Sequence, residues 1–392
     1  MCLVLCPGSA SADLIISPPE VQLQGANLRQ QLLVEQAGAD VTTQASYVSS
    51  APTIIEVDEH GHLIARSQGT ATIQVTVGTE QRSVPVTFAD WAPDRPVDFV
   101  TEIQPLLTRY SCNSGGCHGK ASGQNGFKLS LFGFDAEFDH DALVHEARGR
   151  RIAKSAPEKS LLLTKATGEV PHGGGRRIAP GSDPYETLLR WIRTGAAASA
   201  PDVPRVASLT IEPAERLFQP GQKQQLRVIA RYTDDSTRDV TRQTDYASNI
   251  DVVATIDEQG LLTAGEQSGE AAIMARYMGQ VAVFRAIRPH GQPRQEISGF
   301  KPLNEIDRLA ITKWQKLGLL PSPTCDDATF LRRTTIDLGG RLPRPEEVRQ
   351  FLADSAPNKR EQLVDRLLAS SDYPAYFALK WSVILRNSRL AG

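Results

Sequence analysis

The chain contains one segment twice, and this repeat constrains its fold more than any other feature. Residues 58–73, DEHGHLIARSQGTATI, align with residues 257–273, DEQGLLTAGEQSGEAAI, with one insertion. Apolar residues alternate with polar ones in both copies, as Ile73, Val75 and Val77 do in the first and Leu226, Val228, Ala230 and Tyr232 in the second. Such alternation indicates strands with one buried face, and the shared Asp-x-x-Gly places glycine in a tight turn between them. Short strands and turns at this density predict a β-sandwich in each copy.

Proline-rich stretches at 92–96, 200–204 and 288–293 divide the 392 residues into four parts. Proline fixes its own backbone and biases the preceding residue away from helix, so these stretches suit linkers. We therefore predict a multidomain chain of two all-β sandwiches, one all-α domain between them and one C-terminal all-α domain. The predicted boundaries are 13–91 and 205–289 for the β domains, 97–199 for the helical domain between them, and 300–392 for the last helical domain.

Composition excludes several classes of protein. Hydrophobic residues make up 40% of the chain and charged residues 22%, which is ordinary for a globular protein. A net charge of −2 gives no reason to expect a nucleic-acid partner, and no apolar run reaches the roughly 20 residues of a membrane span. A short apolar run ahead of Ala10-Ser11-Ala12 is typical of a signal-peptidase site. We interpret residues 1–12 as the remnant of a signal peptide, with an ordinary chain terminus as the alternative, and predict an exported, periplasmic or otherwise extracytoplasmic protein.

The heptapeptide Cys112-Asn-Ser-Gly-Gly-Cys117-His118 carries the chemistry of the chain. Covalent haem attachment needs two cysteine sulfurs and a neighbouring histidine that binds the iron, usually spaced C-x-x-C-H. Here the spacing is C-x4-C-H, and Gly115 and Gly116 are flexible enough to allow the longer loop. We therefore predict that residues 97–199 form an all-α cytochrome c-like domain, with one covalent haem c and His118 as an axial iron ligand. A disulfide between the two cysteines, or a zinc site that adds His118 and His172, remains an open alternative.

A second axial ligand would be methionine or histidine. The three methionines, at positions 1, 274 and 278, all lie outside residues 97–199. His172 is our choice, because it follows a rigid proline and precedes three glycines that let the backbone approach a flat cofactor. His145, the weaker candidate His140, and the absence of a second ligand are the alternatives.

Helical periodicity surrounds the haem motif and fills the last segment. One apolar stripe precedes the motif and another, capped by Ser182 or Asp183, follows it; their members are Phe99, Ile103, Leu106 and Leu107, and then Leu188, Leu189, Trp191 and Ile192. In the last segment Asn304 is expected to cap a helix that ends at Gly318, and Pro345 to start another. The first of these helices carries one apolar stripe, formed by Ile306, Leu309, Ala310, Trp314 and Leu317. Another apolar helix pattern near the end comprises Phe377, Leu379, Trp381 and Leu385.

Both β segments resemble bacterial immunoglobulin-like domains of group 2. The resemblance rests on the turns at Val57-Asp58 and Ile256-Asp257 and on the Gly-x-Ala-x-Ile that follows each. Domains of this family are usually spacers or adhesive modules of exported proteins. The first copy departs from the second in its His60-x-His62 pair, which we expect to be solvated rather than a metal site.

A wider resemblance covers nearly the whole chain. Cys117-His118-Gly119-Lys120, Pro171-His172-Gly173-Gly174 and Leu189-x-Trp191-Ile192 together resemble the planctomycete-type cytochrome c domain. Ile336-Asp337-Leu338-Gly339-Gly340-Arg341-Leu342-Pro343 resembles the start of the helical domain of unknown function that accompanies it. The resemblance implies that this last domain is truncated here.

The predicted function is an exported c-type cytochrome module that transfers single electrons to a redox partner protein or to a missing C-terminal portion. The alternative is a non-redox cell-surface adhesion or carbohydrate-binding protein, whose β domains bind carbohydrate or protein and in which Cys112 and Cys117 form a disulfide. Enzymatic activity has weak support, because its only candidates, Asp337 and the Arg332-Arg333 pair, are better explained as structural and solvated residues.

Overall fold

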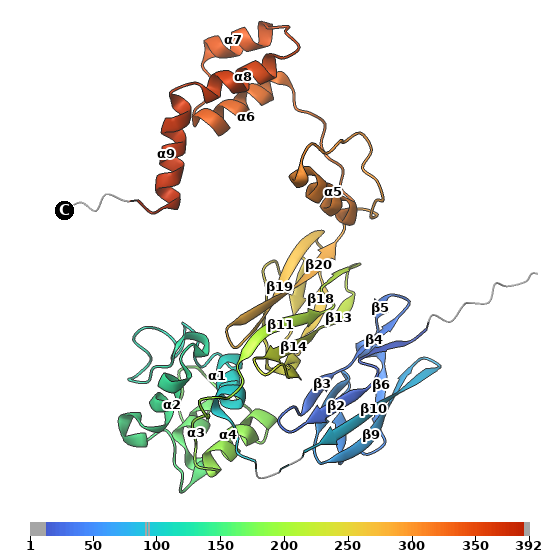
Figure 1. The fold of residues 1–392 in the computed structure, drawn as a ribbon, viewed down its shortest axis with the longest axis vertical. Helices are drawn as coiled ribbons and strands as arrows, with labels where there is room; N and C mark the ends of the chain where they lie inside the picture. The colour runs from blue at the N-terminus through green and yellow to red at the C-terminus, as the bar shows by residue number, and fades with distance from the viewer. Residues whose placement is uncertain (1–12, 91, 93–94, 388–392) are drawn as a thin grey trace, which may run out of the picture. The chain divides into compact units, whose positions relative to one another are not determined.

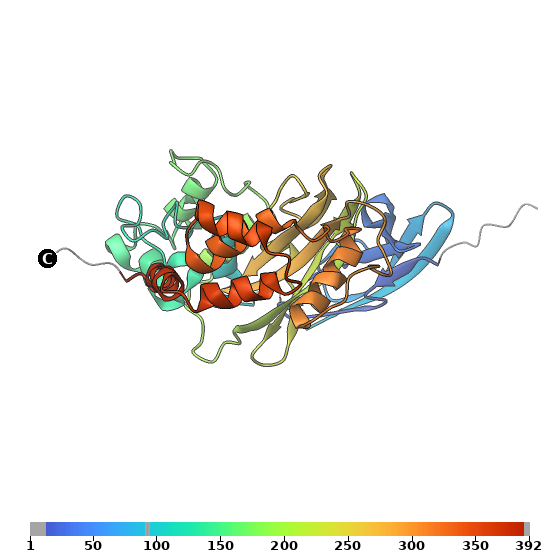
Figure 2. The ribbon, with the colours of Figure 1, turned by 90° about the horizontal axis from the view of Figure 1, so that it is seen from above.

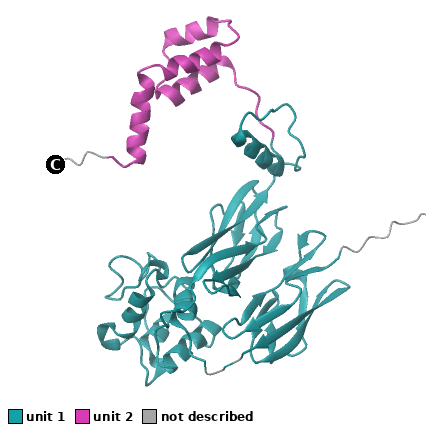
Figure 3. Ribbon diagram, in the orientation of Figure 1, with its two compact units in different colours: residues 1–319 teal, residues 320–392 magenta. Residues whose placement is uncertain are grey.

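The computed structural model describes residues 13–90, 92 and 95–387, so the predicted signal-peptide remnant lies outside the described residues. Two compact units can be separated, residues 1–319 and residues 320–392 (Figure 3). Unit 1 contains both β segments, the helical segment between them and one further helix. Unit 2 contains the last four helices.

The first β domain has three sheets that enclose one core. Its strands are β1 (Ile15–Ser17), β2 (Val21–Gln24), β3 (Arg29–Gln31), β4 (Leu33–Gln36), β5 (Ala39–Asp40), β6 (Ser46–Ser49), β7 (Ile55–Val57), β8 (His62–Ala65), β9 (Gly69–Val77) and β10 (Glu80–Ala89). They are ordered β1-β4-β5, β3-β8-β7 and β2-β10-β9-β6, with β2 parallel to β10. The predicted alternation is confirmed at Ile73 and Val75, which are fully buried.

The second β domain repeats the first strand for strand. Its strands are β11 (Val206–Glu212), β12 (Glu215–Leu217), β13 (Lys223–Gln225), β14 (Arg227–Tyr232), β15 (Thr237–Asp239), β16 (Asp245–Ser248), β17 (Ala254–Ile256), β18 (Leu261–Ala264), β19 (Gly269–Tyr277) and β20 (Gln280–Arg288). The orders β11-β14-β15, β13-β18-β17 and β12-β20-β19-β16 match those of the first domain, and β12 is parallel to β20. The sequence repeat is therefore a repeat of topology.

The two β domains pack against each other through equivalent residues. Oδ2 of Asp239 accepts hydrogen bonds from Nε2 of Gln30 (3.0 Å) and from the next backbone N–H (2.7 Å). In return, Oδ2 of Asp40 accepts from Nε2 of Gln224 (2.8 Å) and from the next backbone N–H (3.3 Å). Each copy thus inserts the same carboxyl group against the same strand of the other, which is the pattern of a two-fold interface. Figures 1 and 2 show the two domains side by side.

The segment between the β domains is helical. A single π-helical turn (Phe99–Ile103) leads into α1 (Gln104–Arg109), and α2 (Ala136–Val144), α3 (Leu161–Ala166) and α4 (Asp183–Arg193) follow. Both predicted stripes lie in its core, where Phe99, Ile103, Trp191 and their neighbours are buried. Ser182 occupies the N-cap position of α4, but its side chain makes no capping bond. The helices agree with the predicted helical class, while the finer assignment to a cytochrome c fold stays a prediction.

Helix α5 (Glu305–Leu317) belongs to unit 1. It begins and ends where predicted, because Asn304 Oδ1 accepts from the N–H of Asp307 (2.9 Å) and Gly318 takes a left-handed conformation with φ 67°. The apolar stripe predicted on this helix is largely exposed, since Ile306 is 76% and Leu309 64% exposed. Only the end of the helix, at Leu317, is buried.

Unit 2 is a small helical domain. It consists of α6 (Asp327–Gly339), α7 (Pro345–Ala353), α8 (Lys359–Leu368) and α9 (Asp372–Ile384). Leu331, Phe351, Leu363 and Leu367 form its core. The predicted start of a helix at Pro345 is confirmed. The helix predicted near the end of the chain is confirmed as α9, although Leu379 and Trp381 of its apolar pattern are 63% and 57% exposed. Among the described residues, no helix is long and apolar enough to cross a membrane.

Candidate functional site

The loop from Cys112 to His118 folds back on itself and forms one wall of a cavity. The backbone N–H of His118 donates to the carbonyl of Cys112 (3.0 Å), and that of Gly119 donates to the carbonyl of Ser114 (3.0 Å). The buried Asn113 ties the loop to α1 through a bond from Nδ2 to Oγ1 of Thr108 (2.9 Å). The extra residues of the C-x4-C-H motif therefore form a compact turn.

Glycine is required directly after this motif. A Cβ atom on Gly119 would lie 1.9 Å from the carbonyl oxygen of Asn113 and 2.6 Å from its carbonyl carbon. Both atoms belong to the backbone of the same turn, so they cannot be moved aside as a side chain can. The close approach at Gly119 is what lets the turn close.

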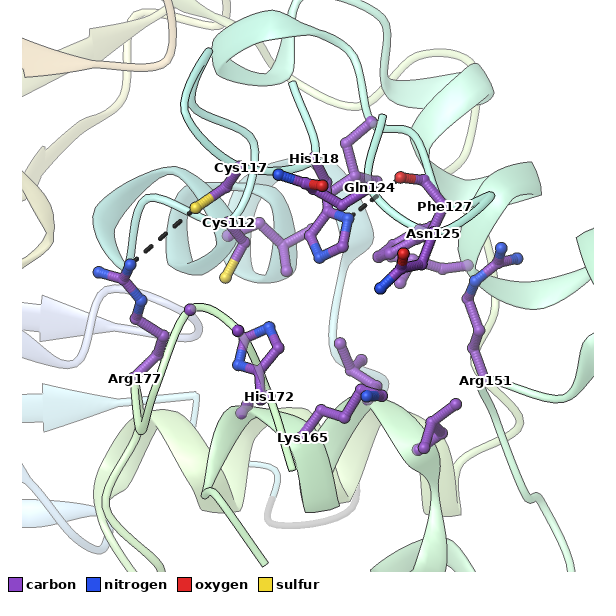
Figure 4. A pocket seen from close by; sticks show the side chains of 18 of the residues that line it. Cys112, Cys117, His118, Gln124, Asn125, Phe127, Arg151, Lys165, His172 and Arg177 are labelled. Carbon is purple, nitrogen blue, oxygen red and sulfur yellow. Dashed lines mark hydrogen bonds between the residues drawn. The ribbon is translucent and has the colours of Figure 1, made fainter. Parts of the chain in front are cut away.

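The opposite wall of the cavity carries His172. The structure brings the His172 ring across from that of His118, with 6.3 Å between ring centres and 6° between ring planes. Cys112 and Cys117 line the same cavity, whose volume is about 500 Å³. All four residues predicted from the sequence thus meet at one site (Figure 4).

The two imidazoles are held in the same way. Nδ1 of His118 lies 3.1 Å from the carbonyl oxygen of Phe127, and Nδ1 of His172 lies 2.9 Å from that of Gly175. A carbonyl can only accept, so a neutral ring must donate from Nδ1, which leaves the lone pair on Nε2 free. Burial lowers the pKa of His118, although its bond to Phe127 opposes this shift. Metal-binding histidines are usually oriented in this way by a partner on the other ring nitrogen.

Both cysteines of the site are free thiols. The disulfide considered as the alternative is therefore not formed. Burial raises the pKa of Cys112 to about 12, and the charge of Arg177 acts in the opposite direction, so this thiol is protonated at neutral pH. The guanidinium of Arg177 lies 4.0 Å from Sγ of Cys117.

The cavity combines apolar walls with positive charge. Its lining includes Arg150, Arg151, Lys165 and Arg177 and no carboxylate. Arg151 is buried, donates to the carbonyls of Ala142 (2.6 Å) and Gly126 (3.0 Å), and stacks 4.4 Å from the ring centre of Phe127. Figure 4 shows Arg177 beside the thiols and Arg151 on the other side of the two rings. Sequence reasoning missed these cations, although the Arg-Arg pairs at 150–151 and 176–177 could have signalled them.

The alternative histidines do not reach this cavity. Nε2 of His140 lies 2.9 Å from the carbonyl oxygen of Ala196, and Nδ1 of His145 lies 2.7 Å from Oδ1 of Asp141. With Asp141 they make up the one group of three His, Cys, Asp or Glu side chains, among the described residues, whose atoms are close enough for a single ion. The cysteine-histidine zinc site considered from the sequence is not formed. The expected solvation of the His60–His62 pair was also wrong, because His62 is only 5% exposed.

Comparison with known families identifies the two ends of the chain. Residues 12–88 match the family described as bacterial Ig-like domain (group 2), and residues 305–392 match PSCyt2, described as a protein of unknown function (DUF1549). No curated protein matches. The resemblance is thus shown for the Ig-like domain and for the helical C-terminal domain, and only loosely supported for a planctomycete-type cytochrome.

Solved structures give weak similarities. A crystal structure of the S-layer protein rSbsC is 11% identical over 73% of this chain and 29% of its own length, with a TM-score of 0.20. Domains 5–6 of the S-layer protein SbsC are 9% identical over 71% of this chain and 98% of their own length, with a TM-score of 0.28. A GH10 xylanase from termite gut that contains a bacterial Ig-like domain is 17% identical over 24% of this chain and 22% of its own length, with a TM-score of 0.17. The chain spans less than a third of the first of these proteins, and all three scores are below 0.5.

These findings correct the predicted function. The matched Ig-like domain indicates an extracellular or cell-surface protein and supports the alternative over an electron-transferring cytochrome module. The part of the alternative that made Cys112 and Cys117 a disulfide is not upheld, since both are free.

Proposed function

We propose that the chain is a cell-surface binding protein in which two Ig-like domains support a helical ligand-binding domain. The observation that carries this proposal is the cavity between His118 and His172, where four cations and no carboxylate surround two imidazoles with free Nε2 atoms. A volume of about 500 Å³ lies within the range of sites for small molecules and cofactors. In this proposal the Ig-like domains are spacers that contact carbohydrate or protein at the surface, and the protein is exported to the periplasm or beyond.

The group that best fits this cavity is haem c. Two imidazoles that bind one metal from opposite sides are separated by two metal–nitrogen bonds of about 2 Å and the half-widths of both rings, roughly 6 Å in total. The observed 6.3 Å separation and parallel planes satisfy this requirement. The motifs that resemble the planctomycete-type cytochrome c domain support the same group.

Each residue would then have a separate role. His118 and His172 would hold the iron through Nε2, and Cys112 and Cys117 would form thioether bonds with the edge of the macrocycle. Arg150, Arg151 and Lys165 would balance the acidic substituents of the group, because they line the cavity and only Arg151 has a carboxylate nearby, that of Glu146 at 3.7 Å outside the lining. When bound, the group would supply an iron held by His118 and His172, and the thioether bonds of Cys112 and Cys117 would anchor it to the loop.

The cofactor proposal is tested with protein exported in a host that has the c-haem maturation machinery. We expect a haem stain that survives denaturing electrophoresis and is lost in a Cys112→Ser/Cys117→Ser variant. His172→Ala should keep the stain and change the absorption spectrum from that of a six-coordinate to that of a five-coordinate iron. His145→Ala, which removes an exposed histidine outside the cavity, is the matched control. A colourless wild-type protein would refute the cofactor assignment.

The surface location is tested separately, by adding protease to intact cells that produce the chain. We expect degradation of the chain while a cytoplasmic marker survives. Protection of the chain until the cells are lysed would contradict the proposed location, whatever the cavity binds.

A further inference from the structure

A second cavity, of about 310 Å³, lies where the three domains of unit 1 meet. The first β domain contributes Arg29 and His62, the helical segment contributes Glu102 and Arg190, and the second β domain contributes Arg238. None of these residues belongs to the His118–His172 site. Because each domain supplies part of the lining, the cavity exists only in the assembled unit.

The lining of this cavity holds more arginines than carboxyl groups: Arg29, Arg109, Arg190, Arg238 and Arg242 against Asp58, Glu102, Asp183 and Asp239. The carboxylate of Glu102 accepts two hydrogen bonds of 2.7 Å from Arg95. Arg190 lies 4.0 Å from the same carboxylate and therefore shares it with Arg95. Nε of Arg190 has no hydrogen-bond partner among the described residues. Arg190 is therefore a cation without a carboxylate of its own.

The same sharing occurs on the other side of the cavity. Asp183 faces both Arg29, at 3.6 Å, and Arg66, at 3.2 Å. Arg238 stacks on the ring of Tyr232, at 4.5 Å from its centre, and makes no ion pair within the part of the chain that the structure describes. Two guanidinium groups, those of Arg190 and Arg238, thus lack a dedicated counter-charge.

His62 supplies an unsatisfied polar atom in the cavity wall. Its side chain is 95% buried, and its Nε2 has no hydrogen-bond partner among the described residues. Burial and the nearby Arg242 and Arg29 lower the pKa of His62, so the ring is neutral and can donate one hydrogen bond. A buried polar atom without a partner is costly, and a ligand in the cavity would remove that cost.

We propose that this cavity binds a small oxyanion, a carboxylate or phosphate group, through Arg190, Arg238 and His62. An oxyanion accepts charge-assisted hydrogen bonds from guanidinium groups, which are among the strongest in proteins. It would also neutralise the excess charge at the domain junction. Free phosphate and the carboxylate of an acidic sugar both present negatively charged oxygens that these side chains can bind.

The test is calorimetric titration of the purified chain with inorganic phosphate and, separately, with glucuronate. We expect saturable binding of at least one of the two, weakened about tenfold or more in Arg190→Gln and in Arg238→Gln by loss of a charge-assisted bond. The matched control is Arg193→Gln, on the same helix, whose side chain is 53% exposed and pairs with Glu158 outside the cavity. This control should bind as the wild type does, and Arg150→Gln reports whether the anion binds at the His118–His172 cavity instead.

The outcomes separate the possibilities. Tighter binding of phosphate identifies a phosphoryl ligand, and tighter binding of glucuronate identifies an acidic sugar. The proposal is overturned if neither solute binds, or if Arg193→Gln or Arg150→Gln weakens binding as much as Arg190→Gln does. His62→Gln, which keeps one side-chain N–H, should bind better than His62→Leu, and equal binding by the two would remove His62 from the site. Thermal unfolding of each variant shows that it is folded.

Discussion

Replacing Gly119 by alanine tests whether the haem-motif loop depends on its close backbone approach. The new Cβ would lie 1.9 Å from the carbonyl oxygen of Asn113 and 2.9 Å from that of Ser114. Because Asn113 is fully buried and bonded to α1, the loop cannot relax without losing that bond. Overpacking in a tight site costs about 1–3 kcal/mol, and we expect the upper end of this range because backbone atoms must move.

The matched control is Gly116→Ala in the same loop, where a Cβ would have nothing within 4 Å. At such a position alanine is neutral or stabilises by about 0.4–1 kcal/mol, since it restricts the unfolded chain. The two variants should therefore differ by about 3 kcal/mol in the free energy of unfolding. In a domain of 60–100 residues a change of 1 kcal/mol shifts the Tm by about 4–8 °C. The helical segment of Gly119→Ala should therefore melt roughly 12–24 °C below that of Gly116→Ala.

The assay is scanning calorimetry with far-UV circular dichroism, on both variants and the wild type. In addition, Gly119→Ala should lose the spectral signature of paired histidines in protein made with haem, while Gly116→Ala should keep it. Equal melting temperatures for the two glycine variants would refute the argument that the backbone contact at Gly119 closes the loop.

Two further predictions concern the β interface and unit 2. Burial raises the pKa of Asp40 from 3.8 to about 6, above its unfolded value, so the folded state holds this proton more tightly. The free energy of unfolding should fall by up to about 3 kcal/mol as the pH rises from about 4 to about 6. Urea denaturation at several pH values should show a smaller fall for Asp40→Asn than for the wild type. An equal fall in the two proteins would refute the assignment of this pH dependence to Asp40. In unit 2, Leu331→Ala should cost about 2–5 kcal/mol because Leu331 is 1% exposed. Leu342→Ala, at a position 56% exposed, should cost under about 0.5 kcal/mol in the same denaturation, and similar costs would contradict the core assignment.

The sequence predicted the members of the first cavity but not its charge. Two cysteines and two histidines could be chosen by residue type and by their place in the haem motif and the Pro-His-Gly stretch, because residues 97–199 hold no other cysteine and only two other histidines. The cations Arg151 and Lys165 could not be chosen, since arginine and lysine occur throughout the surface and only the fold decides which of them line a cavity. The helix ends at Asn304 and Gly318 were predictable because capping depends on local sequence alone.

Burial was the least predictable property. The apolar stripe of α5 shows which face of the helix is apolar, but it does not show what covers that face, and Ile306 is exposed. The prediction for His62 differed in the opposite direction, because this residue was expected to be solvated and is buried. As part of an isolated strand it would be solvated, and packing among the domains of unit 1 is what buries it.

The domain junction explains why the first β domain carries a histidine where the second carries leucine. Asp40 and Asp239 make reciprocal contacts, so the two copies are related by an approximate two-fold axis and each should offer an equivalent groove. The helical segment breaks that symmetry, because its Glu102 and Arg190 line a cavity next to β8, which begins at His62.

The ion pairs at the junction follow the same asymmetry. Arg242 in the second copy bonds to Asp58 of the first at 2.8 Å. The equivalent position in the short 3₁₀ helix of the first copy is Thr43, which cannot form the matching ion pair with Asp257. The ion pair between Arg242 and Asp58 therefore has no counterpart at the symmetry-related position. A scaffold role alone would not require this asymmetry, whereas a binding site for an anion at the junction would.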